Sequence, residues 1–228
     1  MRRPAAHRHA AGFTLVEVLV ALLVMAVMAV MSWQGVDGIV RSRDASQQRL
    51  EQTLRLNTVV AQWEQDLASV QDTGVLPLAL GCDGASVRLT RRAGDGIQVV
   101  VWSLRPDSEG SASTDAIWLR WAGPVVADAS ALQDSWLASL QLQGREPGQL
   151  RALPGVLQWQ VYFFQGNEWA NCQSTGDAAE APAAPASSAS APQRIARQVL
   201  PTGVRSVLGF APGSGLAGSL VRDTLLQP

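Results

Sequence analysis

The sequence has few of the side chains that most enzymes use for catalysis. It contains no lysine, and its two histidines, His7 and His9, both lie near the start of the chain. The rest of the chain therefore cannot supply a Ser-His-Asp or Cys-His catalytic site. With two cysteines in all, the usual zinc ligand sets are excluded as well. We predict no catalytic residue, no metal and no cofactor.

Charge is also scarce. Charged residues make up 16% of the 228-residue chain, and the formal net charge is −1. Proteins that bind nucleic acid normally carry a basic face or stripe. We therefore expect no nucleic-acid partner.

Carboxylate pairs are the remaining catalytic option. Glu64 and Asp66 are two residues apart in a helical pattern and should point in different directions. Asp107, Glu109 and Asp115 fall in a polar loop. We predict that all five are solvated surface charges. A calcium site is not expected, because the aspartates near glycine-containing turns form no dense acidic loop: Asp83, Asp95 and Asp128.

What the chain does have is a long apolar run near its start. Residues 13–33 are apolar except for Thr14, Glu17 and Ser32, and a basic stretch, residues 2–8, precedes them. A helix of this length spans about 30 Å, the thickness of the hydrocarbon core. The basic stretch should stay in the cytoplasm, which places everything after the run in the periplasm of a Gram-negative cell.

Two simpler interpretations of the run are less satisfactory. A secretory signal peptide has a shorter apolar region followed by small residues at its cleavage site, but here Ala11 and Gly12 precede the run. A plain membrane anchor leaves Glu17 unexplained, because an acidic side chain at a bilayer centre costs about 2.5–3.5 kcal/mol.

The segment GFTLVEVLVALL resembles the N-terminal signature of type IV prepilins and type II secretion pseudopilins. The resemblance implies that a prepilin peptidase cleaves after Gly12, that the new amino group of Phe13 is methylated, and that the apolar helix is retained. It also implies that Glu17 neutralises the N-terminal amine of a neighbouring subunit during assembly. Two buried charges, each costly alone, are then tolerated as a pair.

The helical pattern continues over residues 34–72, which predicts a single helix of more than fifty residues with the run before it. Gly35 and Gly38 predict a bend or local melting at the membrane exit, since glycine destabilises a helix by up to about 1 kcal/mol. Apolar residues at helical spacing predict one buried face: Leu50, Leu54, Val60, Trp63, Leu67 and Val70.

From residue 73 onward the pattern is that of short strands. The stretch SVRLTRRAGDGIQVVVWSLR predicts a hairpin, because Gly and Asp suit the positive φ angles of tight turns. DAIWLRWAG, LASLQLQG, VLQWQVYFFQ and GVRSVLGFA alternate similarly, and in VLQWQVYFFQ one face holds Leu157, Trp159, Val161 and Phe163. We predict an α+β fold in which the long helix packs on an antiparallel β-sheet head, residues 73–228. The resemblance makes this arrangement pilin-like.

One stretch of the head, residues 176–193, is rich in Ala, Pro and Ser and predicts a disordered, solvated loop between two strands. Cys82 and Cys172 lie in the part expected in the periplasm, where disulfides form. If paired, they close a loop of about ninety residues and stabilise the head by about 4–5 kcal/mol. The alternative is two separate buried thiols.

The eight tryptophans allow a carbohydrate-binding interpretation, but we assign most of them to packing. Trp33 lies at the membrane exit, and Trp136 and Trp169 are candidates for exposed partner contacts. The tryptophans expected in the core are Trp63, Trp102, Trp118, Trp121 and Trp159.

Beyond the N-terminus, four segments resemble the J-type minor pseudopilin of the type II secretion system: SWQGVDGIVRSRD, WEQDLAS, ALPGVLQWQVYFFQGNEW and LPTGVRSVLGF. This resemblance implies a single-pass inner-membrane protein with a periplasmic head. Its partners would be the I-type and K-type minor pseudopilins and the major pseudopilin. Together they would start the pseudopilus and support export of folded proteins. The alternatives are a minor pilin of a type IV pilus or DNA-uptake system and, more distantly, a membrane-anchored periplasmic binding module or hydrolase.

Overall fold

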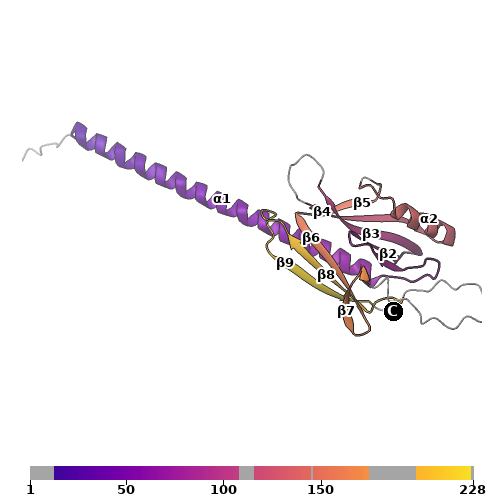
Figure 1. Ribbon diagram of the computed structural model, residues 1–228. Helices are drawn as coiled ribbons and strands as arrows, with labels where there is room; N and C mark the ends of the chain where they lie inside the picture. Colours follow the sequence, from indigo (N-terminus) through magenta and orange to yellow (C-terminus); the bar gives the residue numbers. More distant parts are fainter. Residues whose placement is uncertain (1–12, 108–115, 145, 175–198, 227–228) are drawn as a thin grey trace, which may run out of the picture. The chain divides into compact units, whose positions relative to one another are not determined.

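The computed structural model describes residues 13–107, 116–144, 146–174 and 199–226 (Figure 1). The predicted leader, residues 1–12, and the predicted disordered loop, residues 176–193, lie outside the described residues. The chain divides into two compact units, Met1–Leu50 and Glu51–Pro228.

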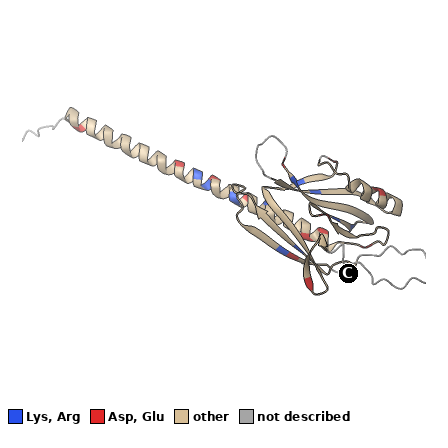
Figure 2. Cartoon of the chain, viewed as in Figure 1, with Lys and Arg blue, Asp and Glu red and all other residues tan. Residues whose placement is uncertain are grey.

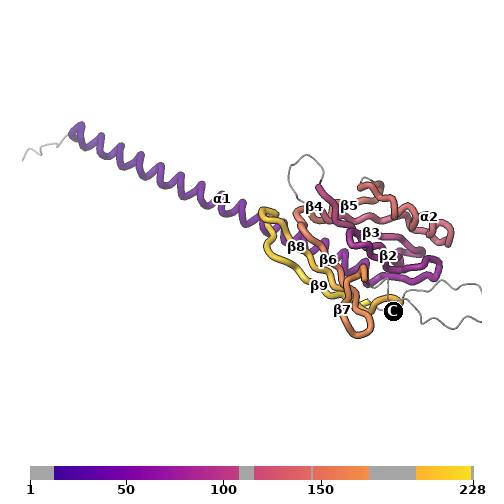
Figure 3. The backbone as a smooth tube through the Cα atoms, in the orientation of Figure 1, coloured from indigo at the N-terminus to yellow at the C-terminus, as the bar shows by residue number. Residues whose placement is uncertain are grey.

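One uninterrupted helix, α1 (Leu15–Ala68), begins in the first unit and ends in the second (Figure 3). Its 54 residues confirm the expected long helix. The predicted melting at Gly35 and Gly38 is wrong, because both residues are helical. The penalty of about 1 kcal/mol per glycine is too small to break a cooperative helix that has long stretches of good helix formers on both sides. Charged residues are nearly absent from the first half of α1 (Figure 2).

In its described residues, the second unit contains two antiparallel sheets and a short helix, α2 (Ala129–Ser139). The first sheet has the order β1 (Leu80–Cys82), β2 (Ser86–Ala93), β3 (Gly96–Pro106), β4 (Ala116–Val126) and β5 (Gln149–Pro154). The second has the order β7 (Glu168–Asn171), β6 (Val156–Gln165), β8 (Gly203–Phe210) and β9 (Ser219–Leu225). The predicted α+β, pilin-like fold is thus confirmed, with two sheets in the head.

The hairpin predicted around AGDG is present as β2 and β3. Ala93 pairs with Gly96 at its tip, and Gly94 has a φ of 56°. This left-handed conformation is the one for which the glycine was needed.

The main core lies where the end of α1 meets both sheets. Trp63 of α1 is 1% exposed, and its ring lies 5.6 Å from that of Trp102 on β3 and 5.7 Å from that of Trp159 on β6. Trp118 joins the same cluster, with its ring 4.4 Å from that of Trp102. Edge-to-face and tilted contacts of this kind add to the burial of large apolar area. The core assignment of these four tryptophans is confirmed.

The buried face of α1 is shorter than the sequence predicted. Leu50 and Leu54 are 58% and 56% exposed, whereas Leu56 is partly buried and Val59 is buried. The helical spacing of leucines identifies a face of α1 but not the length of helix that the head covers.

The central strand β3 is buried on both faces, and one of the segments that cover it was wrongly predicted. α2 lies beside β3 and β4 (Figure 1). Val99 and Val101 pack against Leu132 of α2, whereas the alternate residues Val100 and Trp102 belong to the main core. LASLQLQG was predicted as a strand, but Leu137–Ser139 belong to α2 and the rest to the turn after it. The buried positions of α2, Leu132, Ser135 and Ser139, follow a helical spacing that the apparent alternation concealed.

A second correction concerns β6. The sequence placed Leu157 on the inward face, but its side chain is 53% exposed. The register of β6 against β8 shifts between Val156 and Gln158. An irregularity of this kind inserts one residue into the alternation and reverses which face the preceding side chains occupy.

Candidate functional site

The N-terminal motif forms the first turn of α1. Thr14 precedes the first helical residue, and its Oγ1 accepts a hydrogen bond from the backbone N–H of Glu17 at 3.3 Å. The Glu17 Oε2 in turn lies 3.5 Å from the backbone N of Thr14. This reciprocal arrangement is a capping box, which satisfies backbone donors that the start of a helix leaves unpaired.

The capping box gives the Glu17 carboxylate partners within its own subunit. The Thr14 hydroxyl is also 3.5 Å from Oε2. Sequence reasoning singled out Glu17 for assembly but assigned no role to Thr14, although the spacing of a Thr and a Glu three residues apart is the signal for this motif.

The N-terminal part of α1, residues 15–33, is apolar and exposed on all sides. Phe13 is 85% exposed, and the large apolar side chains that follow as far as Trp33 are all exposed. α1 is the helix, among the described residues, that is long and apolar enough to cross a membrane by length and composition. Such a surface is stable in lipid and not in water.

Residues 7–33 match the family model of the prokaryotic N-terminal methylation motif. This match supports a type IV prepilin-like N-terminus. A search of curated proteins found no match to the chain. The pilin-like motif and the α+β head behind it support a structural subunit that is processed by a prepilin peptidase and assembles with other pilin-type subunits.

In the head, the structure overturns the prediction that Asp66 is a solvated charge. Asp66 is 0% exposed, and its carboxylate accepts hydrogen bonds from Arg91 at 2.8 Å, from Arg120 at 2.7 Å and from the Trp102 indole at 2.8 Å. Gln62 also donates to Oδ1, at 3.1 Å. A buried carboxylate requires this number of donors. The cluster joins the end of α1 to β2, β3 and β4.

The other acidic residues take ordinary roles where they are described. Glu64 is half-buried, and Asp107 forms an ion pair with Arg151 at 2.7 Å. Glu109 and Asp115 lie outside the described residues. Within the described part of the chain, no group of three or more His, Cys, Asp or Glu side chains could hold a metal ion.

Asp83 has a structural role in the turn between β1 and β2. Its carboxylate accepts hydrogen bonds from the Ser86 hydroxyl at 2.8 Å, from the Ser86 backbone N–H at 2.6 Å and from Arg88 at 2.8 Å. Partial burial raises the pKa of Asp83, but these donors outweigh it, so that the pKa lies below its ordinary value.

The structure joins Cys82 and Cys172 by a disulfide, with the Cα atoms 5.8 Å apart. The bond connects β1 of the first sheet to the residue that follows β7 of the second. Its formation in the cell remains a prediction that depends on the periplasmic location of the head.

The two tryptophans proposed for partner contacts are both partly buried. Trp136 packs against the second core between α2 and the first sheet. Trp169 lies on β7, and the guanidinium of Arg205 stacks over its ring at 4.3 Å. Arg205 also pairs with Asp223, with two N–O distances of 2.7 Å. The partner role of both tryptophans stays a prediction.

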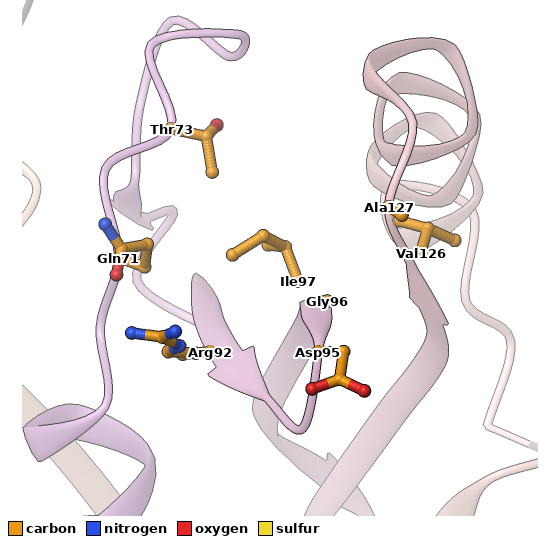
Figure 4. Close-up of a pocket in the computed structure, with 8 residues that line it drawn as sticks. All are labelled: Gln71, Thr73, Arg92, Asp95, Gly96, Ile97, Val126 and Ala127. Atoms are coloured by element: carbon orange, nitrogen blue, oxygen red, sulfur yellow. The ribbon is translucent and has the colours of Figure 1, made fainter.

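A hollow of about 360 Å³ lies beside the β2–β3 turn (Figure 4). Its charged lining residues are Arg92 and Asp95, and Ile97 contributes an apolar side chain between Thr73 and Val126. Asp95 is the one carboxylate in this lining and Thr73 the one hydroxyl, so the hollow lacks the pair of carboxylates that two-carboxylate hydrolysis uses.

Proposed function

We propose that the protein is a minor pseudopilin of the type II secretion system, of the J type. The observation that carries the proposal is the prepilin motif at residues 7–33, continued by a helix that bears Glu17 and ends in an α+β head. The likeness of four further segments to J-type sequences supports the subtype.

In this proposal, a prepilin peptidase removes residues 1–12 after Gly12, and the amino group of Phe13 is methylated. The apolar half of α1, residues 13–33, anchors the subunit in the inner membrane, and the head lies in the periplasm. The basic residues before the run support this orientation.

Assembly would proceed by lateral packing of pilin-type helices in the membrane. The carboxylate of Glu17 would neutralise the N-terminal amine of a neighbouring I-type, K-type or major pseudopilin. The pair is favourable because each charge alone is expensive in hydrocarbon. Before assembly, the hydrogen bonds to Thr14 would reduce the free-energy cost of holding the Glu17 carboxylate in hydrocarbon.

Co-purification and gene deletion together test the proposal. The full-length protein, extracted from the inner membrane, should co-purify with minor pseudopilins. Cells that lack it should accumulate folded exoproteins in the periplasm while retaining surface pili and DNA uptake. Loss of pili or of DNA uptake with intact secretion would instead identify a minor pilin.

A further inference from the structure

The second sheet has an open strand edge beside the Cys82–Cys172 disulfide. β7 pairs with only part of β6, from Tyr162 to Gln165, and one more bond runs from the Cys172 N–H to the Val161 carbonyl at 3.1 Å. The remainder of β6 on this edge extends past the end of β7.

The backbone of Trp159 faces this open edge. Residues i and i+2 of a strand present their N–H and C=O groups to the same side. Since the Val161 carbonyl points toward the β7 edge, the N–H and C=O of Trp159 do so as well. No backbone hydrogen bond to either group is formed by the residues that the structure describes on this edge. The side chain of Trp159, by contrast, is 7% exposed and directed into the core.

After Cys172 the chain leaves the edge of β6, so the described residues that follow do not pair with Trp159. The Asn171 side chain accepts a hydrogen bond from the backbone N–H of Gln173 at 3.0 Å. The Gln173 side chain donates to the carbonyl of Asp83, also at 3.0 Å. These bonds draw the residues after Cys172 toward the β1–β2 turn, and the edge at Trp159 stays open.

A cavity of about 290 Å³ occupies the space left by this turn. None of its lining residues is charged. Val87, Trp159, Val161 and the disulfide contribute apolar surface, and the polar side chains come from both sheets: Ser86, Gln158, Gln160, Asn171 and Gln173. Carboxamides and backbone groups offer donors and acceptors that match those of a peptide. A charged side chain would find no counter-charge among the lining residues, and burial of an unpaired charge is strongly unfavourable.

We propose that this cavity binds a short, extended, uncharged peptide segment of a partner protein by strand addition to β6 at Trp159. The segment would extend the line of β7, antiparallel to β6, and exchange hydrogen bonds with the N–H and C=O of Trp159. Addition to a strand edge supplies affinity through the main chain, whatever the sequence of the partner. The cavity volume is just below the range of about 300–1,000 Å³ for ligand pockets, so it can hold a few residues of a peptide and not a folded domain.

The test uses the full-length protein in detergent, labelled with ¹⁵N-tryptophan, and the peptide acetyl-Ala-Thr-Val-Ser-Ala-amide. The Trp159 signal is assigned with a Trp159→Phe variant. Saturating peptide should slow hydrogen exchange of the Trp159 amide by about tenfold or more, the effect of one added hydrogen bond. The other tryptophan amides should change much less. A peptide with N-methyl groups on alternate amides, which lacks those donors, should not bind.

Two variants locate the binding. Gln158→Arg places a bulky charge at the cavity and should weaken peptide binding by about tenfold. The matched control Gln133→Arg changes an exposed glutamine on α2 and should leave binding within about twofold. Unchanged exchange at Trp159, or equal binding of the N-methylated peptide, would overturn the proposal. So would binding that appears only after deletion of residues 176–193, because the cavity would then belong to the chain's own insertion.

Discussion

The carboxylate of Asp66 lies 2.7 Å from Nε of Arg120, and a second contact, from Nη2 of Arg120 to the other oxygen, measures 3.0 Å. This two-point geometry fixes the end of α1 against the first sheet. Arg91 is held in the same cluster by Gln98, whose Oε1 accepts hydrogen bonds from Nε of Arg91 at 3.2 Å and from its Nη2 at 2.9 Å. The bonds are short and charge-assisted, which makes them strong and directional.

Replacement of Asp66 by Ala should therefore lower the free energy of unfolding by about 3–5 kcal/mol, because two guanidinium groups would lose their buried counter-charge. Urea titration of the full-length protein in detergent, followed by tryptophan emission, measures this change. Glu64→Ala, two residues away on a half-buried position, is the control and should change stability by about 0.5 kcal/mol or less. Similar effects of the two substitutions would show that the cluster contributes no net stability.

Asp66 also shows where sequence reasoning fails. From one sequence, a helical carboxylate near other charges is most simply a surface residue, and its partners Arg91 and Arg120 are 25 and 54 residues away. Only the fold brings them together. Thr14 and Glu17, by contrast, are local in sequence, and their spacing alone predicts the capping box.

The same distinction explains the fold as a whole. The long helix and most of the strand segments follow from local patterns, whereas LASLQLQG shows that a short alternating segment can instead form a helix. The division into two sheets, the α2 cover of Val99 and Val101 and the irregularity before Gln158 depend on contacts between distant segments. Periodicity therefore predicted β3 and β6 as strands but did not predict both faces of β3 as buried or Leu157 as exposed.

The disulfide gives a second stability prediction. Cys82→Ser should lower the free energy of unfolding by about 2–5 kcal/mol, mainly because the unfolded chain gains freedom when the long loop is opened. Cys172→Ser and the double substitution should have nearly the same effect, since each removes the same bond. A mass measurement under non-reducing conditions should give no free thiol in protein isolated from the periplasmic side. Detection of two free thiols there would contradict the pairing.

The turn at Asp83 predicts a specific dependence of stability on pH. Its folded pKa lies below its ordinary value near 3.8, so the ionised side chain stabilises the folded state. This contribution is complete above the unfolded pKa and is lost as the pH falls through the lower, folded pKa. The stability difference between the wild type and an Asp83→Asn variant should thus be constant above about pH 5 and should shrink in more acidic solution.

Chemical unfolding of both proteins between neutral and acidic pH measures this difference directly. The subtraction is necessary because Asp223 also has a lowered pKa, through its hydrogen bond with Arg205, and loses its contribution in the same direction. A difference that grows on acidification would mean that burial, and not the donors from Ser86 and Arg88, determines the pKa of Asp83.

The last prediction concerns Glu17, whose carboxylate has a local role in the capping box and a proposed role between subunits. Glu17→Leu removes both, whereas Glu17→Gln keeps a side chain that can cap the helix but carries no charge. Both variants should insert into the membrane and lose the leader after Gly12, as mass spectrometry of the mature N-terminus would show. Co-purification with other pilin-type subunits should fail for both.

The glutamine variant separates the two roles. If capping of the first turn were the function of Glu17, Glu17→Gln would assemble like the wild type and only Glu17→Leu would fail. If both variants are processed normally and both fail to assemble, assembly requires the negative charge of Glu17, because charge is the property that both variants lack. Within its own helix, the Glu17 carboxylate has only the long contacts to Thr14, at 3.5 Å. Equal failure would therefore mean that the contact needed for assembly is the one with the terminal ammonium of a neighbouring subunit in lipid.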